Sequence, residues 1–104
     1  MSPILINAVV FQAEGMWIAQ CLEYDFVICA ATRDDLPGAL MRQVLAQIEL
    51  DLADGREPFF EFKPASPKYW RMFEEARRRS LPIRRSAKRP EHTKVEAQLF
   101  PVAA

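Results

Sequence analysis

The stretch from Trp17 to Leu52 constrains the fold most, because its hydrophobic period changes once along its length. Two apolar runs, 16–22 and 26–32, contain β-branched and aromatic residues and no glycine or proline, which is typical of strands. The three residues between them, 23–25, are enough for a hairpin loop. From Leu36 onward apolar residues recur at every fourth position, the spacing of one helix face. The stretch therefore predicts two antiparallel strands and then a long helix with one buried face.

The flanking residues extend this unit. Residues 4–12 are apolar at nearly every position, which predicts a first strand buried on both faces. Gly15 suits the turn into the next strand. Asp35 is the expected N-cap of the helix, and Gly55 is the expected stop. Together the segments predict an antiparallel meander with one helix packed on it.

The second half of the chain is less regular. Residues 58–63, PFFEFK, predict a fourth strand, placed at a sheet edge because it begins with proline. Ser66 and Pro67 indicate the start of a second, amphipathic helix over 67–80. From residue 81 onward the chain is basic and carries prolines, which favours an extended segment, with 95–102 as a weak candidate for a late strand.

These elements predict an α+β fold with a three- to four-stranded, mainly antiparallel sheet in the order β-β-β-α-β. A long helix covers one face, and a second helix and a basic tail follow. The domain is expected over residues 1–63, while 64–104 form a carboxy-terminal helix, about 67–80, and a partly extended tail rather than an independent domain.

The 104 residues suffice for one domain with a single core. No apolar run approaches the ~18 residues of a membrane span. The first residues lack the basic segment and cleavage site of a secretory signal. We therefore expect a cytoplasmic protein without membrane contact.

The two cysteines, Cys21 and Cys29, fall within the two facing strands. A disulfide requires an oxidising compartment, and a zinc site usually requires four ligands. Small buried apolar residues are the favoured interpretation of both positions.

A net charge of zero conceals a strong asymmetry. Residues 1–62 carry ten acidic side chains and three basic ones, whereas residues 63–104 carry eleven basic and four acidic ones. Such a division predicts either contact between the halves, within or between chains, or a basic tail that meets an acidic partner such as nucleic acid.

Motifs for catalysis are mostly absent. The sequence contains no glycine-rich phosphate loop, no nucleophile elbow and no HExxH zinc motif. His92 lies in the basic tail, and Asp25, Asp34 and Asp35 are better explained by turn and capping roles than by a magnesium site. We therefore expect no enzyme activity, no catalytic residues, no cofactor and no metal.

The strand–hairpin–strand–helix unit also resembles a known family. An aromatic residue, an alanine and a leucine in the strand precede an acidic turn, and a polar cap then leads into Leu-x-x-Ala-Leu. This pattern is similar to the amino-terminal domain of HicB-type antitoxins over about residues 4–54. The matching residues are Trp17, Ala19, Leu22, Asp25, Asp35, Leu36, Ala39, Leu40 and Ile48.

The resemblance implies a partial ribonuclease-H-like fold without the nuclease's catalytic carboxylates. It also implies an antitoxin that binds and neutralises a small basic ribonuclease toxin, helped by charge complementarity with an acidic body. The carboxy-terminal half shows neither a helix-turn-helix nor a ribbon-helix-helix, so a standard DNA-binding domain is not expected.

Two alternatives stay open: a nucleic-acid-binding module that uses the basic carboxy-terminal segment, and a structural homo-oligomeric domain without a toxin partner. A homodimer or higher homo-oligomer is expected, because one helix leaves an apolar sheet face exposed unless a second helix or a second subunit covers it. The candidate residues for contact with a partner or with nucleic acid are Tyr69, Trp70, Arg77, Arg78, Arg79, Arg84, Arg85, Lys88 and Arg89.

Overall fold

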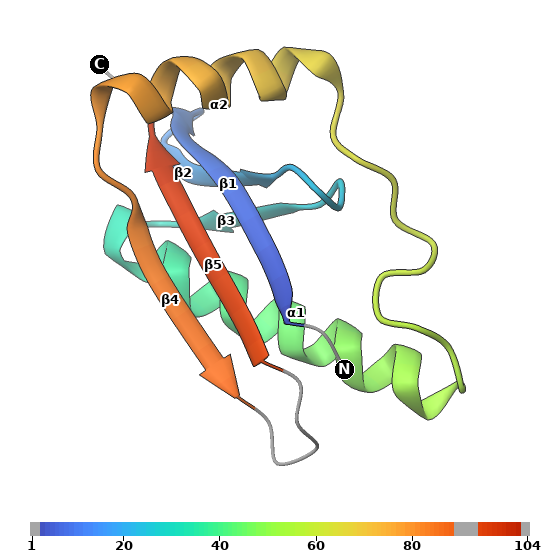
Figure 1. Ribbon diagram of the computed structural model, residues 1–104. Helices are drawn as coiled ribbons and strands as arrows, with labels where there is room; N and C mark the ends of the chain where they lie inside the picture. The colour runs from blue at the N-terminus through green and yellow to red at the C-terminus, as the bar shows by residue number, and fades with distance from the viewer. Residues whose placement is uncertain (1–2, 89–93, 103–104) are drawn as a thin grey trace.

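The protein is described here by a computed structural model, which places residues 3–88 and 94–102. Its five strands form one mixed sheet in the order β3-β2-β1-β5-β4 (Figure 1). Only β1 and β5 are parallel; the other neighbours are antiparallel. The elements follow the order β1 (Ile4–Ala13), β2 (Met16–Cys21), β3 (Val27–Ala30), the 3₁₀ helix η1 (Arg33–Asp35), α1 (Leu36–Ala53), α2 (Pro67–Arg79), β4 (Ile83–Lys88) and β5 (Lys94–Pro101).

The α+β class, the amino-terminal meander and the long helix on one sheet face are confirmed. The predicted strand count and order are wrong. The described residues contain five strands, and the chain runs β-β-β-α-α-β-β rather than β-β-β-α-β. The difference arises because a predicted strand after α1 is not formed, whereas the carboxy-terminal segment supplies two.

β1 lies at the centre of the sheet, as its nearly continuous apolar sequence predicts. It pairs with β2 on one side and with β5 on the other, so both of its edges are satisfied. The turn into β2 places Glu14 at φ 51° and Gly15 at φ 78°. Two successive residues with positive φ are the requirement of the tight hairpin turn whose twist matches antiparallel strands.

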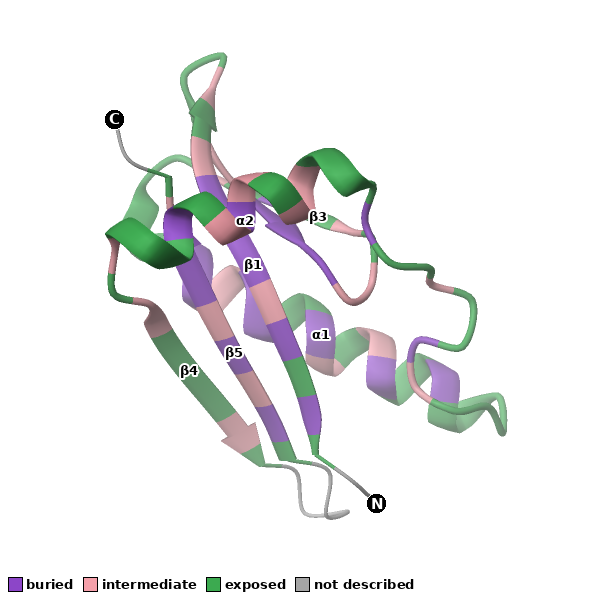
Figure 2. Ribbon diagram, turned by 45° about the horizontal axis from the view of Figure 1, so that its top comes forward, coloured by how far each residue is buried: buried purple, intermediate pink, exposed green. Residues whose placement is uncertain are grey.

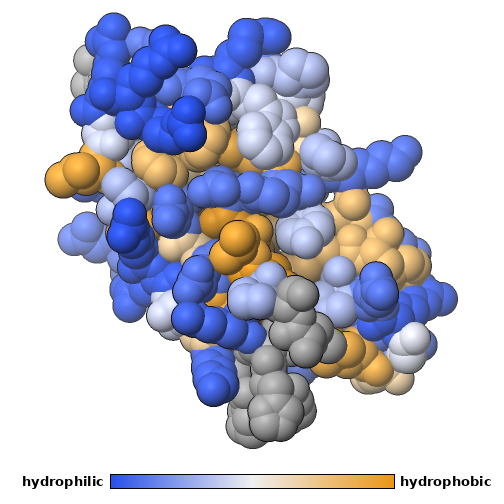
Figure 3. Space-filling view, viewed as in Figure 1, coloured by the Kyte–Doolittle hydropathy of each residue, from blue (hydrophilic) through white to orange (hydrophobic). Residues whose placement is uncertain are grey.

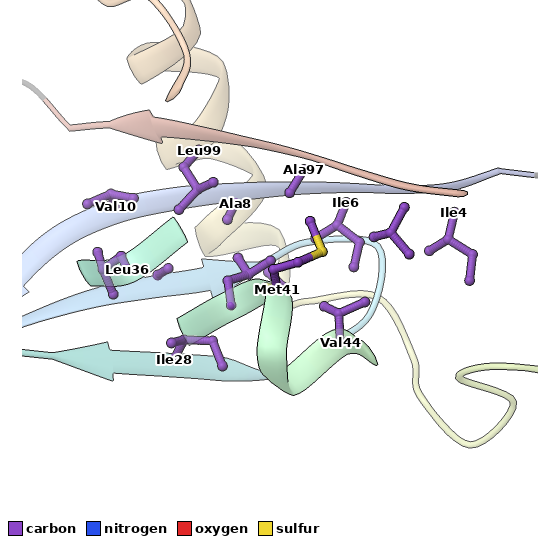
Figure 4. Packing of buried hydrophobic residues seen from close by; sticks show 14 of the residues in the cluster. Ile4, Ile6, Ala8, Val10, Ile28, Leu36, Met41, Val44, Ala97 and Leu99 are labelled. Atoms are coloured by element: carbon purple, nitrogen blue, oxygen red, sulfur yellow. The ribbon is translucent and has the colours of Figure 1, made fainter. Parts of the chain in front are cut away.

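The main core lies between α1 and the sheet face that it covers, which we call the α1 face. Figure 4 shows side chains from β1 and β5 pointing toward those of α1. In the predicted row at every fourth position, Leu36, Leu40, Val44 and Ile48 are completely buried, whereas Leu52, at the end of the helix, is 39% exposed and does not belong to the core. The sheet contributes Ile4, Ile6, Ala8, Val10, Ala19, Cys21, Ile28, Val95, Ala97 and Leu99.

Both expected ends of α1 are confirmed. The helix begins at Leu36 after Asp35, which is the N-cap residue although its side chain makes no capping hydrogen bond. Instead, η1 winds the chain into the helix. The helix ends at Ala53, and Gly55 follows at φ 73° with its N–H donating to the Leu52 carbonyl oxygen at 3.0 Å. This left-handed conformation is what makes glycine an effective helix stop.

The fourth strand predicted for residues 58–63 is wrong, because this segment forms tight turns. Phe59 adopts φ 63°, and its N–H donates to Asp51 Oδ2 at 2.8 Å. Its ring is buried and stacks against that of Tyr24, with centroids 4.4 Å apart. Phe60 is instead exposed beneath the Arg56 guanidinium. Phe59 and Phe62 therefore do not form one face of a strand. With Tyr24 and Phe26 they form a cluster of aromatic rings beside the sheet, which we call the aromatic plug.

α2 covers part of the opposite sheet face, which we call the α2 face. Its bounds agree with the predicted 67–80 helix, and Phe73 and Ala76 are buried there. The Phe73 ring meets that of Phe100 edge to face at 5.2 Å. A second core forms here from Val9, Leu22, Ala65, Phe73, Ala76 and Phe100. Of the two covers that the sequence analysis left open for this face, a second helix or a second subunit, the structure shows the second helix, so this argument for a homodimer no longer holds.

The segment after residue 81 is part of the sheet and not only a tail. β5 lies between β1 and β4, and its Val95, Ala97 and Leu99 are buried on the α1 face. The weak strand candidate over 95–102 is thus confirmed as an interior strand. Pro101 is tolerated because it ends the strand, and the next N–H, of Val102, donates to the Val10 carbonyl oxygen at 2.8 Å. β4 forms the exposed edge (Figure 2).

Candidate interaction surface

Six of the candidate residues lie on two consecutive elements, the last turn of α2 and β4. We call this set the basic surface; it consists of Arg77, Arg78, Arg79, Arg84, Arg85 and Lys88. The Ser80 hydroxyl fixes the link between the elements, because Oγ lies 2.8 Å from the Ala76 carbonyl oxygen and 3.0 Å from that of Pro101. In Figure 3 hydrophilic side chains gather over α2 and along β4, with hydrophobic surface between them.

Two of these six cations are already engaged within α2. Arg77 pairs with Glu74 at 2.9 Å, and Arg79 pairs with Glu75 at 2.7 Å. These exposed pairs one helical turn apart contribute a few tenths of a kcal/mol each, about 0.3–0.5. Arg78 and the three cations of β4 form no ion pair among residues 3–88 and 94–102. The charge on β4 is therefore available to a partner.

The cations of β4 project from both sides of the sheet. Ile83 and Ala87 pack against the main core, so Arg85 between them lies on the α1 face. Arg84 and Lys88 alternate with these residues and lie on the α2 face. Arg84 borders a shallow hollow of about 270 Å³ there, whose lining includes Ser86, Glu96 and Gln98.

The candidate aromatic residues have mainly packing roles. Tyr69 stacks on Phe11 with centroids 6.3 Å apart, and Trp70 meets Phe73 edge to face at 6.1 Å. Both are partly buried against the second core. Trp70 still borders an open groove along the outer side of α2, with Arg71 and Arg78 among its lining residues. The structure thus separates these aromatic rings from the cations of β4.

Other candidates of the sequence analysis are placed as follows. Arg89 and His92 lie outside the described residues. Asp25 accepts a hydrogen bond from Gln20 Nε2 at 2.8 Å, while Asp34 and Asp35 lie on η1. Within the described ranges no three histidine, cysteine or acidic side chains are grouped so as to hold a metal ion.

Folding removes several carboxylates from the acidic body's surface. Glu23 accepts from the backbone N–H and the side-chain amide of Asn7, both at 2.7 Å. Asp51 is buried beneath the aromatic plug. Six acidic side chains stay exposed without an ion pair in the described part of the chain: Glu14, Asp25, Asp34, Asp35, Asp54 and Glu57.

The ion pairs within the described ranges join residues of the same half of the chain. Arg56 pairs with Glu61 in the acidic half, while the pairs of Arg77, Arg79 and Lys94 lie in the basic half. No ion pair among these residues crosses from one half to the other. Among residues 3–88 and 94–102, the ion pairs therefore leave the opposite charges of the two halves unpaired with each other.

Sequence reasoning missed Ser86, Glu96 and Gln98, the polar residues of the hollow beside Arg84. Their neighbourhood depends on the register of β4 against β5, which pairs Arg84 with Gln98 and Ser86 with Glu96. The available signal in the sequence was the alternation of apolar residues (Val95, Ala97 and Leu99) with polar ones (Glu96 and Gln98). The partner strand and its register had no comparable local signal.

The two cysteines differ, although the sequence suggested that both are buried. Cys21 is buried in the main core, whereas Cys29 is exposed, and both thiols are free. Ile28 takes the buried position on β3, and alternation turns Cys29 to the other side. Burial raises the pKa of the Cys21 thiol far above its ordinary value, and the negative charge of Glu23 raises this pKa further.

We expect a thiol reagent such as Ellman's reagent to modify one cysteine, Cys29, in the native protein at pH 8. Cys21 should react only after unfolding, because the thiolate is the reactive form and burial opposes its formation. The variant Cys29→Ser should lose the fast reaction and Cys21→Ser should keep it. Because the Cys21 pKa is raised on folding, its contribution to stability is constant at lower pH and declines above about pH 9. Two fast equivalents in the native protein would contradict the assignment.

The fold and the surface define a class: a small α+β protein whose mixed sheet exposes a basic edge strand beside an arginine-rich helix end. The sequence matches no known protein family, and the chain matches neither a characterised protein nor a solved structure. Within the described residues no helix has the length and apolar character needed to cross a bilayer.

Proposed function

We propose that the protein is an interaction protein of the antitoxin type, which binds and neutralises a small basic ribonuclease. The proposal rests on the resemblance of residues 4–54 to HicB-type antitoxins, together with the charge that the body retains after folding. It places no catalytic step on this chain.

The observation that carries the proposal is that each ion pair among the described residues joins two residues of the same half of the chain. Because no pair among the described residues joins the acidic half to the basic half, none of the six exposed carboxylates of the body is neutralised by a described cation of the basic half. In the same half, Arg33 and Arg42 are the described cations without an ion pair. A basic protein would therefore meet an excess of negative charge, which speeds association and favours the correct partner.

The test begins with affinity capture from the source cell, with and without nuclease, and with mass spectrometry of the bound proteins. We expect a small basic protein that survives nuclease treatment, arrests growth when expressed alone and is harmless when this chain is co-expressed. Recovery of nucleic acid alone, lost on nuclease treatment, would overturn the proposal and favour a nucleic-acid-binding module.

A charge-neutralising variant tests the surface. Changing Asp34, Asp35 and Asp54 to Asn and Glu57 to Gln should weaken toxin binding at least tenfold and reduce rescue. The matched control changes four carboxylates that are already paired, Glu61, Glu74, Glu75 and Glu96, to Gln, and should bind nearly as the unmodified protein does. Equal binding by both variants would show that the body's free carboxylates do not form the interface.

A further inference from the structure

β4 offers an unpaired strand edge. Among residues 3–88 and 94–102 no strand lies on its outer side. Its register against β5 is unbroken from Ile83, opposite Leu99, to Lys88, opposite Lys94. In an antiparallel pair every second residue turns its backbone N–H and C=O away from the neighbouring strand. These outward groups can accept one further strand.

The charges of β4 are arranged for a ligand that lies along this edge. Arg84 and Lys88 project on the α2 face and Arg85 on the α1 face, and none of the three has an ion pair among the described residues. A phosphate backbone lying across one face would meet only the cations of that face. A strand added at the edge places its own side chains alternately on both faces, so it can meet all three.

The apolar residues of β4 indicate which types of side chain an added strand would carry. Ile83 and Ala87 are half-buried and pack against the main core from the α1 face. Small apolar side chains opposite them would extend that core, with an acidic residue between them opposite Arg85. On the α2 face the hollow beside Arg84 is lined by Ser86, Gln98 and Glu96. The Glu96 carboxylate pairs with Lys94 at 2.9 Å, so Arg84 is the unpaired charge that a partner carboxylate would meet there.

A second copy of β4 is a poor occupant of the edge. Two antiparallel β4 strands would gather six cations in one strand pair, and the registers that keep each sheet face continuous set like charges opposite, such as Arg85 with Arg85 or Arg84 with Lys88, which destabilises a sheet. The candidate aromatic rings, Tyr69 and Trp70, are partly buried against the second core, and the groove that Trp70 borders is lined by α2 residues and by no β4 cation. Both facts favour an acidic polypeptide over a second copy or a nucleic acid.

We propose that β4 binds an extended acidic segment of another protein, which adds to the sheet as a sixth strand. The inference goes beyond the proposed function and does not depend on it, because a basic toxin would meet the carboxylates of residues 1–62 and not this edge.

A capped peptide with the core Glu-Val-Thr-Glu-Glu-Val tests the inference. Run antiparallel to β4, this core places Glu opposite Lys88, Arg85 and Arg84, and Val opposite Ala87 and Ile83. We expect fluorescence anisotropy to detect binding to the full chain, and hydrogen exchange to show new protection of alternate β4 amides. A peptide of equal charge, N-methylated at every residue that would bond to β4, should bind at least tenfold more weakly. Equal binding of the methylated peptide, or no binding of either, would overturn strand addition.

Protein variants distinguish binding at the β4 edge from nonspecific attraction between the acidic peptide and positive charge elsewhere. Arg84→Glu with Arg85→Glu should weaken peptide binding at least tenfold, whereas the matched charge change Arg42→Glu with Lys68→Glu, at exposed positions elsewhere, should not. Circular dichroism of both variants establishes that they are folded. Equal loss in both variants, protection at β3 instead of β4, or displacement of the peptide by an equimolar single-stranded oligonucleotide would each contradict the proposal.

Discussion

A chain that ends after residue 93 is expected to be unfolded, because it lacks β5. This strand lies between β1 and β4 and buries Val95, Ala97, Leu99 and Phe100. Burying a large apolar side chain contributes about 1.5–3 kcal/mol. Losing three such residues and a full strand ladder removes free energy comparable with the ~5–15 kcal/mol that stabilises a typical domain. Circular dichroism and the dispersion of amide resonances measure the outcome.

The control for this truncation is rescue in trans. A synthetic peptide of residues 94–102 should restore cooperative unfolding when added in excess, whereas a scrambled peptide should not. The full chain with Gln98→Ala, which changes β5 only on the α2 face, should remain folded. A cooperatively folded truncated chain would show that β5 is not needed to complete the core.

Replacing Asp51 by alanine is expected to lower the free energy of unfolding by about 3 kcal/mol. The Asp51 side chain is almost fully buried; Oδ2 accepts the Phe59 N–H at 2.8 Å, and Oδ1 accepts Gln47 Nε2 at 3.1 Å. Without the carboxylate, a buried N–H loses its acceptor at a residue already held at positive φ. For a domain of this size the melting temperature should fall by roughly 12 °C or more.

The neighbouring residue Asp54 supplies the matched control. It is exposed and lies three residues after Asp51, at the C-cap of α1. Asp54→Ala should therefore change the unfolding free energy by less than about 0.5 kcal/mol. Asp51→Asn keeps one oxygen acceptor and should lie between the two. Chemical denaturation of the three variants measures these differences. Equal stability of Asp51→Ala and Asp54→Ala would show that the carboxylate does not hold the aromatic plug.

Sequence reasoning succeeded where one segment carries a complete local signal. The hairpin turn follows from Gly15, and α1 follows from its four-residue apolar row and from the stop at Gly55. The second helix follows from Pro67 and the aromatic spacing behind it. In each case hydrogen bonds and side-chain contacts close within a few residues, so composition and period determine the outcome.

Residues 58–63 show why a local pattern can mislead. Three phenylalanines after a proline have the composition of an edge strand, yet a buried carboxylate eight positions earlier captures the Phe59 N–H. That bond and the stacking with Tyr24 favour a turn over the strand ladder. The competing partner, Asp51, lies outside the six-residue pattern, so the pattern itself carries no signal for this hydrogen bond.

For the basic surface, too, the sequence determined one part of the result and the tertiary structure determined the other. The sequence by itself determined that residues 63–104 are basic, that a helix ends in three arginines, and that the body is acidic. Only the tertiary structure decided that Arg84, Arg85 and Lys88 lie on an unpaired edge strand, with charges on both sheet faces. It also decided that β5 lies in the sheet interior, because the parallel pairing of β5 with β1 joins positions about 90 residues apart. Helix period and turn chemistry are local properties of the chain, whereas strand order and register are chosen by burial across the whole fold.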